Sequence, residues 1–321
     1  MSAVRRARVP AFAKINLDLR VLYRRPDQFH ELRTIFQTIS LADRIAIAFT
    51  PSPRTSIAVA GNVEIADNLI ARAAKLCLDA MRATGEVRFE LDKRIPMCAG
   101  LGGGSSDAAA VLLTLPVLAG KALEMPVLAR LAAELGSDVP FFLVGGAAVG
   151  IGRGTELYPL PDRPSQHGLL VVPREVQVST SEAYRLLSAE LTVESQQNKM
   201  VSFQSQAWGC ITAPAGGVKR ESGENDFEPV VFRQHPELER VKRRLLKLGA
   251  GPAMMSGSGS AVFGLFPGRS EVQRALPSFR EERVFPITLV RRARYRSEWW
   301  KRLEKHTTRE KLWPPLSRYA R

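Results

Sequence analysis

A glycine-rich stretch is the part of this 321-residue sequence best suited to chemistry: residues 96–107 read Pro-Met-Cys-Ala-Gly-Leu-Gly-Gly-Gly-Ser-Ser-Asp. Residues 87–92 alternate apolar and polar side chains and residues 108–113 favour a helix, so the pattern predicts a strand, a glycine loop and a helix. Glycines let the backbone approach an anion, and the start of a helix attracts one. We therefore predict a polyphosphate site, with Ser105 capping the helix and Ser106 near a phosphate or its metal.

The two common phosphate-loop patterns do not fit this stretch. A P-loop requires a lysine directly after its last glycine, and none follows here. The dinucleotide fingerprint G-x-G-x-x-G fails because its last position, counted from Gly100, is Ser105. A glycine loop alone is also compatible with a plain turn or bulge, so the functional interpretation depends on other residues.

Phosphoryl transfer also needs a group that accepts the proton of the attacked hydroxyl, and a carboxylate can serve. Asp138 is the candidate, because it lies between a predicted helix and the apolar residues 139–143. Lys14, the single charged residue within residues 11–17, is the candidate partner cation. The alternatives are a turn or cap residue for Asp138 and a solvent-facing strand lysine for Lys14.

Three further residues leave alternatives open. Asp107 complements the helix dipole but repels phosphate, so we predict that it bonds loop amides rather than magnesium. His30 is a candidate for recognising a base, or else a surface-loop histidine. Tyr184 is a candidate stacking ring, or else a core aromatic.

Charge and composition narrow the class of protein. The formal net charge is +14, yet residues 26–279 hold 26 basic and 26 acidic residues. The excess lies at the ends, with seven basic residues against one acidic in residues 1–25 and thirteen against five in residues 280–321. Basic ends can bind RNA or anionic lipid weakly, but solvated tails are our preferred interpretation, and we do not expect nucleic acid as a partner.

No feature of the chain predicts export or membrane insertion. Apolar runs fall short of the ~20 residues that cross a bilayer, and charges interrupt any signal-peptide core. The three cysteines form no CxxC pair. We therefore expect a cytoplasmic protein with no membrane partner, and the sequence leaves the oligomeric state open.

Hydrophobic periodicity predicts alternating elements and two domains. The three prolines within residues 159–165 suggest boundaries at 1–163 for the first domain and 164–303 for the second, followed by a basic tail at 304–321. Residues 141–151 read as a buried strand and turn, residues 196–223 as a loop with some helix, and residues 298–303 as a short amphipathic helix. Further strands are predicted at 8–22, 31–49, 169–172 and 261–266, and helices at 68–83, 126–135, 180–187 and 236–248.

The order of these motifs resembles that of the GHMP kinases over about residues 10–300. Within the family, it is most similar to the branch whose acceptor carries a cytidine diphosphate. The motifs occupy residues 13–17, 24–27, 30–32, 67–69, 96–110, 136–142, 152–157, 225–228 and 256–259.

The resemblance implies a two-domain α+β fold, with a ribosomal-S5-like N-terminal domain and a ferredoxin-like C-terminal domain. It implies transfer of the γ-phosphate of ATP, with Mg²⁺, to a hydroxyl of a small molecule. Asp138 would be the base and Lys14 its partner. The acceptor would bind Asn16, Phe29, His30, Asp138, Thr180 and Tyr184, and ATP would bind Asn68, Lys93, Pro96, Gly100, Leu101, Gly102, Gly103, Gly104, Ser105 and Ser106.

Two alternatives and three departures from the family pattern remain. The acceptor could be another small alcohol, such as mevalonate or homoserine, or the chain could be a basic nucleic-acid-binding protein. Gln28-Phe29 replaces the usual Gly-Tyr, which puts the shape of the base pocket in doubt. Pro116 replaces an asparagine and is expected to shorten the phosphate helix to about residue 116. Thr155 is an insertion, and the metal ligands and the purpose of the tail stay open.

Overall fold

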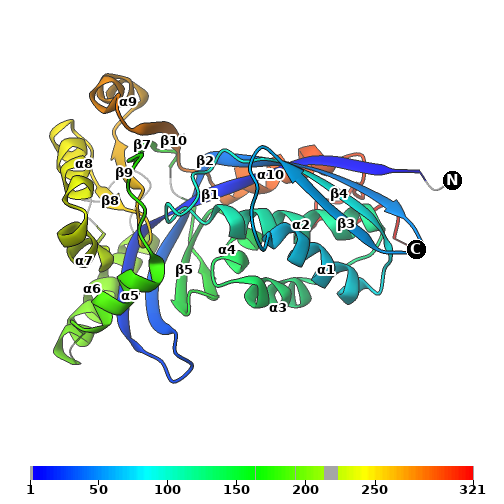
Figure 1. Ribbon diagram of the computed structural model, residues 1–321, viewed down its shortest axis with the longest axis horizontal. Helices are drawn as coiled ribbons and strands as arrows, with labels where there is room; N and C mark the ends of the chain where they lie inside the picture. Colours follow the sequence, from blue (N-terminus) through cyan, green and yellow to red (C-terminus); the bar gives the residue numbers. More distant parts are fainter. Residues whose placement is uncertain (1–2, 163, 192, 213–222, 321) are drawn as a thin grey trace.

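Two β-sheets organise the chain, in the computed structural model that describes residues 3–162, 164–191, 193–212 and 223–320. The first sheet has the order β3-β4-β2-β5-β6, with β1 paired to β2, and the second has the order β10-β7-β9-β8. Figure 1 shows the first sheet with α1 to α4 on the right and the second sheet on the left, with α7 and α8 on its outer side. This confirms the α+β architecture and its two parts.

The first part is built mainly from the first half of the chain. Its strands are β1 (Arg5–Arg24), β2 (His30–Pro51), β3 (Ser56–Gly61), β4 (Gly85–Asp92), β5 (Ala147–Gly152) and β6 (Glu156–Pro159). Its helices are α1 (Leu69–Met81), α2 (Gly103–Ala119), α3 (Met125–Leu135) and α4 (Val139–Val144).

The second part follows the predicted boundary, which lies between β6 and β7 and stays a prediction. Its strands are β7 (His167–Val172), β8 (Ala253–Met255), β9 (Val262–Phe266) and β10 (Arg283–Thr288). Its helices are α5 (Thr180–Ser188), α6 (Val193–Thr212), α7 (Phe227–Gln234), α8 (Pro236–Lys247) and α9 (Arg269–Ala275), with a 3₁₀ turn at Leu276–Phe279. Residues 213–222 of the predicted 196–223 loop lie outside the described residues, and α6 occupies most of the rest.

Strand β1 joins the two parts. It pairs with β2 along its whole length, from Arg5 to Arg24, and its far end reaches the second part, where Leu19 and Val21 enter the second hydrophobic core. Leu19 also forms an isolated bridge with Asn225. A single strand therefore carries residues that face both parts, which explains how a site can form between them.

Helix α2 differs from its predicted shape at both ends. It begins at Gly103 with Gly102 as its N-cap, so Ser105 lies in the first turn and is not the cap. It continues through Pro116 to Ala119, so the predicted shortening is wrong. The helix is buried along residues 106–118, and this packing offsets the one backbone hydrogen bond that a proline removes. Gly120, at φ 78°, ends it.

The predicted strand at residues 141–151 is a helix followed by a strand. Helix α4 occupies Val139–Val144, and β5 begins only at Ala147. A short apolar run does not distinguish a buried strand from a buried helix, and Pro140 is well suited to a first helical turn. As a result Asp138 stands at the N-cap of a helix that the sequence did not reveal.

The C-terminal residues return to the first part. Helix α10 (Arg292–Leu303) covers the predicted 298–303 helix, and its buried Tyr295, Trp299 and Leu303 join the first core. The tail is docked there too, since Ser317 Oγ donates to the carbonyl of Val117 at 2.6 Å. Figure 1 accordingly shows the two chain ends close together on the right. Over the described stretches, no helix combines the length and apolar character that crossing a bilayer requires.

Candidate active site

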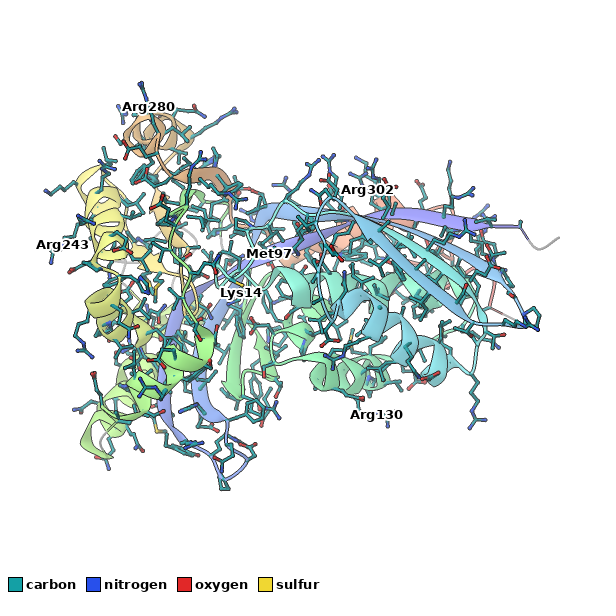
Figure 2. All side chains as sticks on the ribbon, in the orientation of Figure 1. Lys14, Met97, Arg130, Arg243, Arg280 and Arg302 are labelled. Atoms are coloured by element: carbon teal, nitrogen blue, oxygen red, sulfur yellow. The ribbon has the colours of Figure 1, made fainter. Side chains whose placement is uncertain are left out.

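A cavity of about 930 Å³ lies where the two parts meet. Residues from β1, the glycine loop, the start of α4 and α5 all line it. Figure 2 shows Lys14 in the middle of the molecule, near this junction. The cavity is lined by ten of the predicted site residues: Lys14, Asn16, Phe29, His30, Gly100, Gly102, Ser105, Asp138, Thr180 and Tyr184.

The glycine loop is shaped by left-handed backbone and close packing. Gly100 and Gly102 have φ of 72° and 68°, a region that L side chains rarely adopt. A Cβ atom on Gly102 would lie 2.9 Å from the ring of Phe142 and 3.3 Å from Lys14 Cγ. The first turn of α2 carries no acidic residue, so its free amides and positive dipole end point toward the cavity without an opposing charge.

A second glycine-containing loop, at residues 256–260, supports the first. Ser256 Oγ donates to the carbonyl of Gly100 at 2.9 Å, and a Cβ on Gly100 would collide with the carbonyl of Ser256. Asn225 Nδ2 holds this loop by donating to the carbonyls of Met255 and Gly257, each at 2.8 Å. The second loop thus brings Ser258 into the cavity, where its hydroxyl lies 2.9 Å from that of Thr180.

Lys14 and Asp138 form a loose ion pair at the floor of the cavity. Lys14 Nζ lies 3.5 Å from Asp138 Oδ2 and donates to Asn16 Oδ1 at 2.7 Å. Asn16 in turn donates to the Thr34 hydroxyl at 2.7 Å, so the amide that accepts from Lys14 is itself held in place. The Lys14 side chain is buried, whereas that of Asp138 is 33% exposed and does not cap α4. The carboxylate is therefore free to accept a proton from a bound hydroxyl.

Aromatic rings and a histidine line the far side of the cavity. The rings of His30 and Tyr184 stack with centroids 4.6 Å apart, and His30 Nε2 lies 2.6 Å from the Ser188 hydroxyl. Burial, and to a smaller extent the charge of Arg24, lowers the pKa of His30 below its usual 6.5, so its ring is neutral at pH 7. Burial, with a smaller effect of the Asp138 charge, raises the pKa of the Tyr184 phenol.

Phe29 is exposed at the mouth of the cavity. The Arg153 guanidinium lies over its ring, 3.4 Å from the centroid, which leaves the other face available for stacking. The preceding Gln28 has φ 69°, so the turn adopts at Gln28 the left-handed conformation that glycine takes more cheaply. Arg24 Nη2 donates to Gln28 Oε1 at 2.5 Å and holds this side chain.

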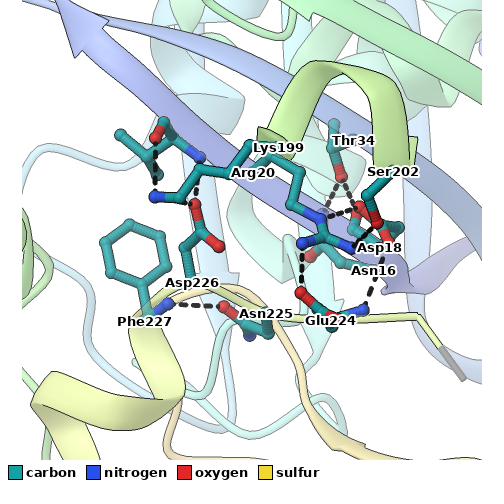
Figure 3. Close-up of polar contacts among 11 residues, drawn as sticks. Asn16, Asp18, Arg20, Thr34, Lys199, Ser202, Glu224, Asn225, Asp226 and Phe227 are labelled. Atoms are coloured by element: carbon teal, nitrogen blue, oxygen red, sulfur yellow. Dashed lines mark hydrogen bonds and ion pairs between the residues drawn. The ribbon is translucent and has the colours of Figure 1, made fainter. Parts of the chain in front are cut away.

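A buried charge network ties β1 to the second part, as Figure 3 shows. Arg20 donates to both oxygens of Asp18 and to Glu224, and Lys199 Nζ lies 2.7 Å from Asp226 Oδ2. Burial raises the pKa of Asp18 although Arg20 opposes the shift. The 225–228 motif is therefore connected to β1, the strand that carries Lys14 and Asn16.

The remaining predicted nucleotide residues lie next to the glycine loop but not along this cavity. Asn68 caps α1 by accepting from the amide of Ile70 at 2.9 Å. Lys93 Nζ lies 2.6 Å from both Asp43 Oδ2 and Asp107 Oδ2, so Asp107 binds this lysine instead of the expected loop amides. A Cβ on Gly103 would lie 3.0 Å from Lys93 Nζ, and one on Gly104 would lie 3.7 Å from Leu69, so both residues adjoin the start of α2. The role toward ATP stays a prediction for Asn68 and Lys93 and for Pro96, Leu101, Gly103, Gly104 and Ser106.

Sequence reasoning missed several residues that line the cavity. Arg24, Arg153 and Ser258 were recognised only as parts of longer motifs. The signal that could have found Ser258 is the alternation of serine and glycine at 256–260, which requires a close backbone approach. The cavity position of Arg153 depends on the β5–β6 turn and has no local signal.

An anion-binding helix start, a lysine–carboxylate pair and an acceptor cavity are the parts of a small-molecule kinase. Comparisons with known proteins agree. The GHMP kinases N terminal domain matches residues 68–146, and the GHMP kinases C terminal domain matches residues 215–283. A protein of Solibacter usitatus named 4-diphosphocytidyl-2-C-methyl-D-erythritol kinase is 56% identical to this chain, covering 99% of each.

Solved structures extend the likeness. A crystal structure of 4-(cytidine 5'-diphospho)-2C-methyl-D-erythritol kinase aligns with a TM-score of 0.71 at 39% identity, over 88% of this chain and 98% of its own. Homoserine kinase from Cytophaga hutchinsonii aligns with a TM-score of 0.69 at 16% identity, over 89% of this chain and 97% of its own, which shows the shared fold alone. The chain belongs to the GHMP kinase family.

Proposed function

We propose that this enzyme transfers the γ-phosphate of ATP to the 2-hydroxyl of 4-diphosphocytidyl-2-C-methyl-D-erythritol, a step in non-mevalonate isoprenoid precursor synthesis. The observation that carries the proposal is the single cavity that brings together a phosphate-binding helix start, the Lys14–Asp138 pair and a ring-and-histidine pocket. The 56% identity over 99% of the chain to a kinase of this name supports the same substrate.

The reacting groups have defined tasks. The amides of the glycine loop and of α2 bind the phosphates of ATP and stabilise the charge that develops on them. Asp138 accepts the proton of the acceptor hydroxyl as this oxygen attacks the γ-phosphorus, and ADP leaves. Lys14, held by Asn16, lies 3.5 Å from Asp138 and can offset charge on the transferred group.

The cytidine end of the acceptor fits the far side of the cavity. Phe29 and Tyr184 supply ring faces, and base stacking contributes about 1–3 kcal/mol per base in other proteins. The Nε2 atom of the neutral His30 ring is taken up by the Ser188 hydroxyl, so Nδ1 is the ring nitrogen offered to the edge of a cytosine. Thr180, at the start of α5, and Asn16 supply hydrogen-bonding groups to the polar acceptor body.

The residues around the loop fit a magnesium ion that arrives with ATP. Mg²⁺ keeps several waters and is held through substrate phosphates with one or two protein oxygens. Asp107 Oδ1 is buried without a hydrogen-bond partner among the described residues, and the Ser106 hydroxyl is in the next position. These two side chains are the candidates that would hold the ion, which would supply positive charge to offset that of the phosphates.

A coupled assay of ADP release tests the function. We expect Mg²⁺-dependent turnover with the cytidyl acceptor and none above background with mevalonate or homoserine. Turnover with either of those two alone would replace the acceptor while keeping the kinase. Salt-sensitive RNA binding that is lost on deletion of residues 304–321, without any kinase activity, would favour the nucleic-acid alternative.

A further inference from the structure

The C-terminal residues bind the end of α4 that lies away from Asp138. The hydroxyl of Tyr295 donates to the carbonyl of Phe142, and Trp313 Nε1 donates to the carbonyl of Leu143 at 2.9 Å. Arg292 Nε donates to the carbonyl of Gly145, directly after the helix, at 3.2 Å. Three side chains from α10 and the tail thus donate to the carbonyls of residues 142, 143 and 145, at the C-terminal end of α4.

These contacts matter because α4 is too short to hold its own geometry. It has six residues, and helices well below about 12 residues are unstable in isolation. The last four carbonyls of any helix lack partners within it. Here Phe141 finds one in the amide of Gly145, and the next two carbonyls depend on Tyr295 and Trp313. The orientation of α4 is therefore set by its surroundings.

The donors themselves are firmly attached. Tyr295 is buried in the first core, and Ser317 Oγ bonds the carbonyl of Val117 near the end of α2. His306 Nε2 lies 2.8 Å from the carbonyl of Arg6, on β1, and the Arg5 guanidinium lies 4.1 Å from the centroid of the Tyr319 ring. The tail is thus anchored to α2 and β1, the elements that carry the glycine loop and Lys14.

The opposite side of α4 meets the phosphate loop. The Phe142 ring packs closely against Gly102, where an added Cβ would lie 2.9 Å from the ring. Asp138 stands at the N-cap of α4 and faces Lys14. A shift of α4 would therefore move the carboxylate relative to both the loop and the lysine. A displacement of about 1 Å at a reacting group can cost about 10²-fold in rate.

We propose that Tyr295 and Trp313 are positioning residues for the phosphoryl transfer: they hold α4 so that Asp138 faces Lys14 and the acceptor hydroxyl. This rests on the proposed function, since it assigns Asp138 as the base. The family models end at residue 283, so neither of them includes these two residues.

Two substitutions in the full chain remove one donor each and keep an aromatic side chain: Tyr295→Phe, which keeps the ring itself, and Trp313→Phe, which replaces indole by phenyl. We expect kcat to fall about tenfold in each, with KM for ATP and for the acceptor within about twofold of the parent, measured well below the unfolding midpoint. Tyr319→Phe is the matched control, because the Tyr319 hydroxyl lies 3.0 Å from His306 Nδ1 in the tail and has no bond to α4. It should keep the parental kcat.

Combination with Asp138→Asn separates positioning from general stability. In that background, Tyr295→Phe and Trp313→Phe should lower the residual kcat no further, because their effect passes through the carboxylate. A lower unfolding midpoint with parental kcat would overturn the proposal, as would an undiminished tenfold loss in the Asp138→Asn background. Tyr295→Phe carries the test if Trp313→Phe fails to fold. Parental turnover of Asp138→Asn alone would instead refute the assigned base, which is part of the proposed function.

Discussion

Two groups of lysine and aspartate flank the start of α2, and they are built in opposite ways. Lys93 Nζ lies 2.6 Å from Asp43 and 2.6 Å from Asp107, and its side chain is 6% exposed. Lys14 Nζ lies 3.5 Å from Asp138, which opens to the cavity. The first group is closed, since it is buried away from the cavity, and its two carboxylates share one lysine. The second leaves a carboxylate uncommitted, which is what a proton acceptor requires.

The closed group also fastens the loop. Asp43 Oδ1 accepts from the amides of Arg94 and Ile95, at 2.5 and 2.8 Å, just before the glycines. Breaking one member of such a buried set leaves the other charges without a partner. Chemically similar groups beside the same helix start therefore have different consequences when altered, one for stability and one for turnover.

The largest effect is expected from the open pair. Asp138→Asn should lower kcat by about 10²–10⁴-fold, because the amide cannot accept the hydroxyl proton. ATP binding and the free energy of unfolding should stay close to those of the parent, since the side chain is partly exposed and does not cap α4. Steady-state kinetics, a nucleotide titration and urea unfolding measure the three quantities. A kcat within threefold of the parent would remove Asp138 from the mechanism.

The same substitution at each lysine sharpens the contrast. Lys93→Met should lower the free energy of unfolding by about 3–5 kcal/mol, because Asp43 and Asp107 are left buried without their cation. Lys14→Met should mainly lower kcat and change the unfolding free energy less, because Asp138 retains contact with water. Urea unfolding and turnover are measured on both. Equal stability losses would show that the two groups do not differ as described.

The acceptor side offers a smaller test. Phe29→Ala should raise KM for the cytidyl acceptor about tenfold and leave KM for ATP unchanged, since one stacked base contributes about 1–3 kcal/mol. Tyr158→Ala is the control, an exposed aromatic outside the cavity. An equal rise in KM for ATP would place the Phe29 ring at the nucleotide instead.

The last expected effect is on the pH dependence of stability and leaves turnover aside. Burial raises the pKa of Asp107 from 3.8 to about 7. The charge of Lys93 opposes this shift, and the charge of Asp43 adds to it. The folded form then binds a proton at Asp107 more tightly than the unfolded form does. The resulting contribution to the free energy of unfolding is complete below about pH 4 and is lost as pH rises through 7. We expect the advantage of the parent over Asp107→Asn to shrink between pH 5 and pH 7.5, by urea midpoints at each pH. An advantage that grows over this range would contradict the shift.

Much of the fold was readable along the chain. The helices at 68–83, 126–135 and 236–248 were confirmed within a few residues, because each is amphipathic and has a clear end: left-handed Arg82 after the first, Gly136 after the second and left-handed Gly249 just after the third. The errors lie where burial overrides local preference. Pro116 stands inside a helix that is buried on all sides, and residues 139–144 are apolar throughout and therefore lack a period.

The candidate site was readable in its parts but not in its connections. Lys14 and Asp138 stand out as charges beside apolar runs, and the structure does bring them together. Lys93 is as easy to notice in the sequence as Lys14. Nothing near it in the sequence predicts that it pairs with Asp43, fifty positions earlier. The tail likewise reads as a basic extension, although Trp313 bonds a carbonyl 170 positions away.

The chain alone therefore establishes the class of enzyme, through the order of its motifs and through glycines whose backbone demands are local. The folded molecule settles which lysine is closed and which is open, how α4 is oriented, and what the tail contacts. The physical reason is that conformational preferences act between near neighbours in the chain. Burial, ion pairing and capping, by contrast, depend on partners that come together only when the two sheets and the C-terminal helix pack.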